Sequence, residues 1–266
     1  MKLKFFIILA ILLVIILSGC VQQQPQTEDE NANMTDNSKV LVGTDDLLKK
    51  ADTEVGNAQN FEPTKLAIKY NKNEGLVNDV EIITNGLPES LKNYMKTITI
   101  AESVDENSAL VDVIMLDAYN LVDGNKSSTC EEQSIINKKK QYRAYENGSI
   151  IAEGTEAQLS NLILPKEKVS INNGWEYNGL NYAAIGVEKL KLEGKEFNAL
   201  KITFGGTNKN VIITGYYLFD YENGRILKQY REETYGTNLV MFTNTVTKIM
   251  PNAKPEDYKD CQDSEK

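Results

Sequence analysis

The chain has 266 residues, of which 41% are hydrophobic and 25% charged, a composition typical of a globular protein rather than of a disordered chain. Its formal net charge of −9 disfavours binding to nucleic acid, or to anionic lipid through a basic patch. The chain contains no histidine, which excludes Ser-His-Asp and Cys-His catalysis, the HExxH zinc motif and other histidine-based metal sites.

The first twenty residues have the pattern of an export signal. Lys2 and Lys4 precede an unbroken apolar run over residues 5–17, which is shorter than the roughly 18–20 residues that span a bilayer comfortably. Residues 17–20 (LSGC) resemble the lipobox of prokaryotic lipoproteins, in which a cysteine preceded by small residues is alkylated by a lipid and exposed by cleavage. We therefore expect a signal peptide over residues 1–19 and lipidation of Cys20. The alternative is an uncleaved signal anchor. Both place the rest of the chain on the extracytoplasmic side of the cell membrane.

A polar tether follows the lipidation site. Residues 20–39 are rich in Gln, Asn, Asp, Glu and Thr, and such a segment cannot bury enough apolar surface to offset its ordering entropy. Removal of the signal leaves 27 basic against 38 acidic residues, a net charge of −11. We therefore expect the lipid to supply the membrane affinity, and residues 40–266 to form a single β-rich extracytoplasmic domain.

Two cysteines remain after lipidation of Cys20. An even pair in an exported protein predicts a disulfide between Cys130 and Cys261, with two free thiols as the alternative. No CxxC motif supports a redox role. The triplets at Asn33, Asn125 and Asn147 match the glycosylation sequon, although such triplets arise by chance in an Asn-rich chain.

The domain is predicted to begin with a helix and to continue mainly as strands. Thr44 is a candidate N-cap, and Leu47, Leu48, Ala51, Val55 and Ala58 repeat at helical spacing. Strands are predicted over Lys65–Tyr70, Val77–Thr84, Thr97–Val104 and Ala109–Ala118. Further on, a hairpin is expected over Gln141–Ala152, and short helices are expected over Pro88–Met95, Glu131–Lys140 and Thr155–Leu164.

The C-terminal third has the most regular pattern. Five strand-like runs are separated by turn residues, and Asn223-Gly224 is the preferred dipeptide of a type I′ hairpin turn. The runs cover Asn181–Leu192, Glu196–Phe204, Val211–Tyr221, Arg225–Thr234 and Leu239–Ile249. A meander of about ten strands must curl to bury one face. The predicted fold is therefore mainly β (α+β): one curved, half-barrel-like antiparallel sheet, packed on an N-terminal helix and short helices.

This order of elements resembles the superfamily of periplasmic lipoprotein carriers and mycobacterial lipid-binding lipoproteins. The most similar pieces are residues 44–61 running into 65–70, residues 145–148 (YENG) and residues 218–227 (LFDYENGRIL). The resemblance implies a half-barrel plugged by helices, with a cavity that accepts acyl chains. Residues 121–171 have no counterpart in that pattern. The Asn-, Lys- and Ile-rich usage is typical of an archaeal or low-GC source.

Three classes of function follow from these observations. The first is a non-catalytic module that binds a hydrophobic ligand, with Trp175, Tyr182 and Tyr216 as candidate ligand-binding residues, although sheets favour such aromatics without any ligand. The second is a surface interaction protein, accessory to a membrane complex. The third is an enzyme, which has the least support because no paired carboxylate or Ser-Lys pattern is recognisable. No cofactor, metal or nucleic acid is expected.

Overall fold

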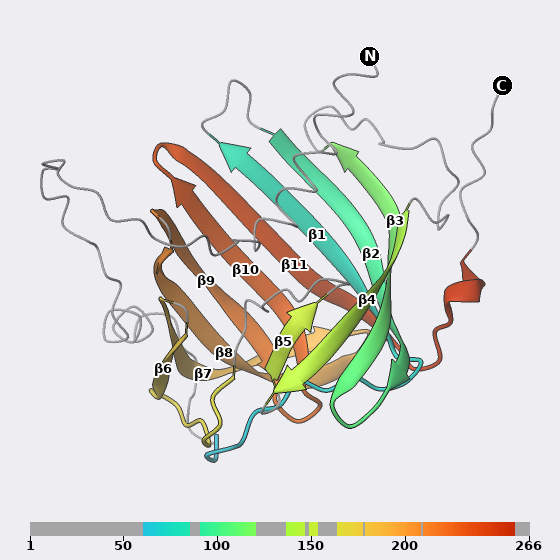
Figure 1. Ribbon diagram of the computed structural model, residues 1–266, viewed down its shortest axis with the longest axis horizontal. Helices are drawn as coiled ribbons and strands as arrows, with labels where there is room; N and C mark the ends of the chain where they lie inside the picture. Colours follow the sequence, from blue (N-terminus) through green and yellow to red (C-terminus); the bar gives the residue numbers. More distant parts are fainter. Residues whose placement is uncertain are drawn as a thin grey trace, which may run out of the picture.

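The computed structural model describes residues 61–85, 91–120, 137–146, 149–153, 164–177, 179–208 and 210–258. They form one antiparallel sheet of eleven strands in the spatial order β5-β4-β3-β2-β1-β11-β10-β9-β8-β7-β6 (Figure 1). The strands are β1 Gly75–Asn85, β2 Leu91–Val104, β3 Ser108–Asn120, β4 Asn137–Glu146, β5 Ser149–Glu153, β6 Gly174–Tyr177, β7 Leu180–Leu192, β8 Lys195–Asn208, β9 Val211–Asp220, β10 Arg225–Tyr235 and β11 Asn238–Met250. The prediction of a single, mainly β antiparallel sheet is confirmed.

The sheet consists of two meanders joined at their inner edges. Strands β1 to β5 follow one another in space as they do in sequence, and so do β6 to β11. The first strand of one meander pairs with the last strand of the other, from Gly75 opposite Met250 to Asn85 opposite Leu239. The two short strands β5 and β6 are therefore the outer edges of the sheet.

Strand pairing determines which side chains share a face. Because directly opposed residues of an antiparallel pair lie on the same face, the register can be followed across the sheet. One row runs through Met95, Val80, Asn244, Gln229, Tyr217 and Ile202. The neighbouring row, one residue further along each strand, belongs to the opposite face and runs through Tyr94, Glu81, Thr243, Tyr230, Tyr216 and Thr203.

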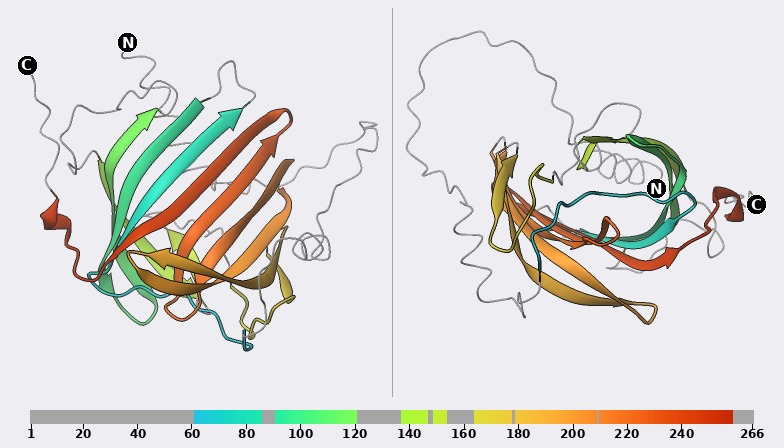
Figure 2. Two further views of the ribbon diagram at one scale, coloured as in Figure 1. Left: turned by 180° about the vertical axis from the view of Figure 1, so that it is seen from behind. Right: turned by 90° about the horizontal axis from the view of Figure 1, so that it is seen from below.

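The sheet is strongly curved, and residues 61–74 run across the inside of the curve (Figure 2). Register shifts that interrupt strand pairs, for example between Val77 and Asn78, add to the twist of the strands. We call residues 61–74 the crossing segment. One bridge, between Thr64 and Val169, is its only strand-like pairing with a described residue. The face that contains Tyr217 packs against this segment and is therefore the concave face.

The crossing segment joins the two meanders by side-chain packing. Leu66 and Ile68 are buried against β7, β8 and β9. Tyr70 packs beside Ala101, Ala109 and Val111, and its hydroxyl accepts a hydrogen bond from the Arg143 guanidinium, which lies 5.4 Å from the centre of the Tyr70 ring. The concave face of the β7–β9 half is covered in this way.

Several predicted elements differ in the structure. The helix expected over Pro88–Met95 is wrong for residues 91–95, which belong to β2 and pair with β1. The helix expected over Glu131–Lys140 is wrong for residues 137–140, which pair with β3. The strand expected over Lys65–Tyr70 is wrong, because these residues pair with no strand of the sheet and contact its concave face through the side chains of Leu66 and Ile68. Strand β6 was not predicted.

Other predictions lie outside the described residues. They are the signal peptide, the tether and Cys20, the N-terminal helix over residues 44–58, Cys130 and Cys261, the sequons at Asn33, Asn125 and Asn147, and nearly all of the helix over Thr155–Leu164. Within the described residues, the helical structure consists of one 3-10 turn, η1, over Pro255–Asp257.

Contacts between the β9–β10 turn and residues 67–69 of the crossing segment can be tested by substitution. Gly224 has a φ of +71°, its carbonyl accepts a hydrogen bond from the Lys69 amide at 2.9 Å, and a Cβ there would lie 2.5 Å from the Ala67 carbonyl oxygen. Gly236, in the turn between β10 and β11, has a φ of +61° and open space around it. A left-handed non-glycine residue costs roughly 1–2 kcal/mol.

We expect Gly236→Ala to lower the free energy of unfolding by only that backbone cost of about 1–2 kcal/mol. Gly224→Ala is expected to lower it clearly more, because the added methyl group also pushes the crossing segment away. Urea unfolding followed by circular dichroism measures both values. Equal losses in the two variants would contradict the close packing of residues 67–69 on this turn.

Candidate functional site

The candidate functional site is the concave face on the β1, β2, β3 and β11 side of the sheet. Six side chains form an apolar cluster there: Val80, Ile82, Met95, Met115, Val240 and Phe242. Val80, Ile82 and Met95 are buried, and the other three are half-buried. All six come from strands of the sheet, and no described segment outside the sheet belongs to the cluster. Met115, Val240 and Phe242 are the members that keep part of their apolar surface accessible to a partner.

The other half of the concave face is filled by an aromatic row. The ring of Trp175 stacks on that of Tyr182 with 5.6 Å between centroids, and Phe204 lies 5.9 Å from Tyr182 and 5.0 Å from Tyr217. Tyr182, Phe204 and Tyr217 are each about 1% exposed. Burial raises the pKa of Tyr182 far above its usual range, so the hydroxyl stays neutral. Because the crossing segment and residues 164–171 pack on this row, it is part of the hydrophobic core.

Polar side chains of β10 lie between the two halves. Gln229, Arg231 and Glu233 alternate along the concave face, opposite Asn244, Phe242 and Val240 of β11. The Arg231 guanidinium forms an ion pair with the Glu233 carboxylate, and the Tyr235 hydroxyl donates a hydrogen bond to that carboxylate. Burial and this hydrogen bond raise the pKa of Tyr235 to about 12, so Tyr235 remains a donor at neutral pH.

The three predicted ligand-binding residues do not form one site. Trp175 and Tyr182 lie together on the concave face. Tyr216 lies on the opposite, convex face, because it is adjacent to Tyr217 in β9. Its ring stacks on Tyr230 at 5.6 Å, and the ammonium groups of Lys201 and Lys228 lie 5.0 and 5.8 Å from its centre.

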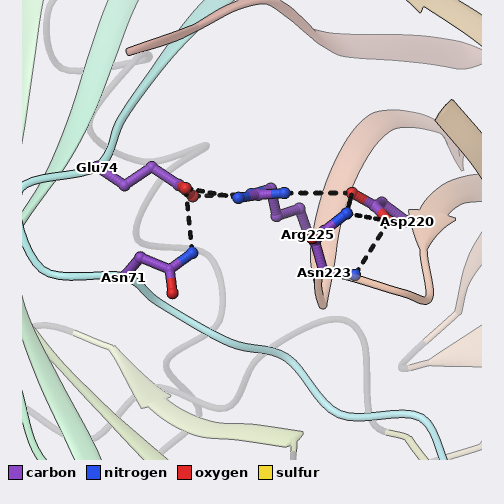
Figure 3. A network of polar contacts seen from close by, with 5 residues as sticks. All are labelled: Asn71, Glu74, Asp220, Asn223 and Arg225. Atoms are coloured by element: carbon purple, nitrogen blue, oxygen red, sulfur yellow. Dashed lines mark hydrogen bonds and ion pairs between the residues drawn. The ribbon is translucent and has the colours of Figure 1, made fainter. Parts of the chain in front are cut away.

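A partly buried polar network fixes the end of the crossing segment to the β9–β10 turn (Figure 3). Arg225 donates two hydrogen bonds to the Glu74 carboxylate, Nε to Oε1 at 2.8 Å and Nη2 to Oε2 at 2.5 Å. Its Nη1 lies 3.4 Å from Asp220 Oδ2, and Asp220 also accepts from the Asn223 backbone and side chain. Asn71 Nδ2 donates to Glu74 at 3.1 Å.

The network positions backbone rather than a reactive group. Burial alone would raise the pKa of Glu74, but hydrogen bonds from Arg225 and Asn71 and the charge of Arg225 lower it below 4.5. The backbone next to Glu74 bonds to both neighbouring elements: Asn73 N donates to the Ala101 carbonyl, and Ala253 N donates to the Asn73 carbonyl. Every carboxylate of the network faces a donor, so the arrangement is structural.

Sequence reasoning missed the residues that distinguish this face. Gln229, Arg231 and Glu233 occupy alternate positions of one predicted strand, and residues at alternate positions of a strand lie on the same face of a sheet. This pattern indicated that polar side chains would share one face of that strand. The pairing of Glu74 with Arg225 joins residues 151 positions apart and left no local signal. Within the described residues, no group of three or more His, Cys, Asp or Glu side chains is arranged to hold a metal ion.

The Glu74–Arg225 pair generates a prediction about stability and pH. We expect Glu74→Gln to lower the free energy of unfolding at pH 7 by about 1.5–3 kcal/mol, the usual range for hydrogen bonds to charged groups. Because the folded pKa of Glu74 is depressed, this contribution is complete above the unfolded value near 4.5 and is lost as the pH falls through the folded value. Urea titrations from pH 7 to pH 3 should therefore show wild type and variant converging on the acid side.

The matched control is Glu102→Gln, which removes a surface pair with Lys140 whose side chains are 52% and 41% exposed. Its effect should stay below about 1 kcal/mol. A Glu74→Gln loss that is no larger than this, or that does not shrink in acid, would contradict the structural role of the network.

Comparisons with known proteins add little to this description. No protein-family model matches the sequence, and no curated protein sequence matches it. In the described residues, no helix has the length and apolar character of a membrane span. Solved structures that match the chain include the following three. An exported protein of Bacteroides fragilis with a YmcC-like fold has 9% identity and a TM-score of 0.32, over 70% of this chain and 99% of that chain.

The second is an outer membrane lipoprotein-sorting protein domain from Vibrio parahaemolyticus, with 10% identity and a TM-score of 0.22 over 70% of this chain and 88% of that chain. The third is a DUF1329 family protein from Desulfovibrio piger, with 10% identity and a TM-score of 0.21 over 80% of this chain and 93% of that chain. TM-scores this low support no statement about the function of this chain.

Proposed function

We propose that the protein is a non-catalytic, membrane-tethered, extracytoplasmic lipoprotein that binds a hydrophobic or amphipathic ligand on the concave face of its sheet. The observation that carries the proposal is the apolar cluster of Val80, Ile82, Met95, Met115, Val240 and Phe242. The ligand belongs on this half because the crossing segment already covers the β7–β9 half. Tyr216 is left out of the proposed site, since it points to the convex face.

The first test is native mass spectrometry of the full chain, purified from its own host or a close one, together with solvent extraction. We expect a lipid-like adduct in about one-to-one stoichiometry that organic solvent removes. A bare mass would contradict ligand binding and favour the alternative, an interaction protein of a membrane complex. The same mass tests the proposed Cys130–Cys261 disulfide, which removes two hydrogens.

A pair of variants tests whether the ligand lies on the concave face of the sheet. Phe242→Gln should lower adduct occupancy by roughly tenfold or more, because burial of one large apolar side chain contributes about 1.5–3 kcal/mol. Thr243→Gln is the matched control, because it makes the same new side chain at the next residue of β11, on the convex face. Equal occupancy in the two variants would argue against the concave face. A ligand confined to the apolar cluster should leave Trp175 emission unchanged, whereas one that displaces the crossing segment should shift it.

The tether is tested separately. We expect Cys20→Ala to abolish lipid attachment and signal cleavage, since the thiol is the group that is alkylated. Intact-mass analysis of the membrane fraction should then show an unmodified precursor, whereas wild type should begin at a lipid-modified Cys20. A wild-type chain that retains residues 1–19 without lipid would instead establish a signal anchor.

A further inference from the structure

Three buried polar atoms on the concave face have no hydrogen-bond partner among the residues that the structure describes: Thr84 Oγ1, Arg231 Nε and Asn244 Oδ1. Thr84 is 6% exposed, and the Arg231 side chain is 20% exposed. A buried polar group without a partner is costly, and folded proteins contain few of them. These three atoms belong to β1, β10 and β11, the strands that carry or border the apolar cluster.

Register places Arg231 and Asn244 next to one another. Asn244 lies opposite Gln229, and Arg231 lies opposite Phe242, so the two residues are diagonal neighbours on one face. Diagonal neighbours in an antiparallel pair are about 7–8 Å apart, within reach of a long side chain. Asn244 also lies opposite Val80, and Phe242 lies opposite Ile82, so the two unpartnered atoms adjoin the apolar cluster.

The charge of Arg231 is already neutralised. Its Nη2 pairs with Glu233, which also accepts a hydrogen bond from Tyr235, while Nε is left as an unused donor. Asn244 Oδ1 is an unused acceptor. An anionic group placed here would lie near the Glu233 carboxylate, and the cation beside it, Arg231, is already paired with that carboxylate. A neutral group that both donates and accepts, such as a hydroxyl, would satisfy both atoms at once.

We propose that Arg231 and Asn244 form a polar subsite for the neutral, hydrogen-bonding head of an amphiphile whose alkyl chain lies on the apolar cluster. Thr84, opposite Val240 at the other end of the cluster, is placed to bond a second oxygen of the same ligand. This inference rests on the proposed function, because it assumes that the concave face holds an apolar chain, and it adds the chemistry of the head group.

The test is a competition among three probes that share a sixteen-carbon chain: hexadecane, 1-hexadecanol and hexadecanoate. The full chain is stripped with solvent, dispersed in nonionic detergent and incubated with an equimolar mixture. It is then gel-filtered, and the retained probes are quantified by gas chromatography and mass spectrometry. Wild type should retain the alcohol over both other probes by about tenfold, which corresponds to 1.4 kcal/mol.

Variants assign the preference to the subsite. Asn244→Leu removes the acceptor at similar size and should bring the alcohol-to-alkane ratio close to one, with the hydrocarbon still retained. Arg231→Lys is a second, charge-matched variant that removes the Nε donor and keeps a cation beside Glu233, and it should lower the ratio in the same direction, so the inference does not depend on one variant's folding. Thr243→Val, on the convex face of β11, is the control and should keep the wild-type ratio.

The outcomes separate the two proposals. Equal retention of alkane and alcohol by wild type would overturn the subsite and leave the apolar site in place. Preference for hexadecanoate would overturn the neutral head group, and an unchanged ratio in both Asn244→Leu and Arg231→Lys would overturn the assignment to these residues. Retention of none of the probes would overturn the proposed function itself.

Discussion

The antiparallel pairing of β1 with β11 is the interaction on which the rest of the structure depends. It joins two meanders that would otherwise each have one more open edge, and it pairs residues near positions 75–85 with residues near 239–250. Bringing such distant parts of the chain together costs loop-closure entropy. That entropy is offset only when the full set of contacts between β1 and β11 has formed. The apolar cluster exists because of this pairing, since its members come from both meanders.

The crossing segment is a second connection between the two meanders. It covers the β7–β9 half of the concave face and leaves the β1–β11 half without it. It is held by the Glu74–Arg225 ion pair, by backbone hydrogen bonds near residue 73 and by burial of Leu66 and Ile68. A buried ion pair adds little net stability compared with apolar packing, but losing one partner is costly. The pair therefore acts mainly to define where the segment lies. With one half covered by the chain itself, the β1–β11 side is the half on which we propose that a ligand binds.

Much of the sheet could be predicted from local pattern, and its long-range register could not. Alternation was sufficient for the C-terminal strands and their order. Asn223-Gly224 located a turn correctly, but the type I′ prediction is wrong, because four residues separate β9 from β10 and of this dipeptide only Gly224 has a positive φ. The short strand β6 has too few residues for a period of two to be visible, and Lys138, Lys139 and Lys140 concealed a strand that pairs with β3. Tyr216 was chosen for its aromatic ring, but the face it occupies depends on pairing with β8 and β10. Arg231 was missed for the same reason.

Strand β10 is the part of the sheet that folding alone explains least. It is paired on both sides, yet it carries Gln229, Arg231 and Glu233 on the concave face and Lys228, Tyr230 and Glu232 on the convex face. Apolar side chains at the concave positions would join the aromatic row to the apolar cluster in one continuous core, and replacing a buried ion pair in this way is often neutral or stabilising. Strand β10 instead keeps the Arg231–Glu233 ion pair. The Arg231 Nε donor and the neighbouring Asn244 Oδ1 acceptor of β11 make no hydrogen bond within the described part of the chain. This donor and this acceptor are available to the proposed ligand, and for that reason we propose that its selectivity depends on β10 and β11 rather than on the aromatic row.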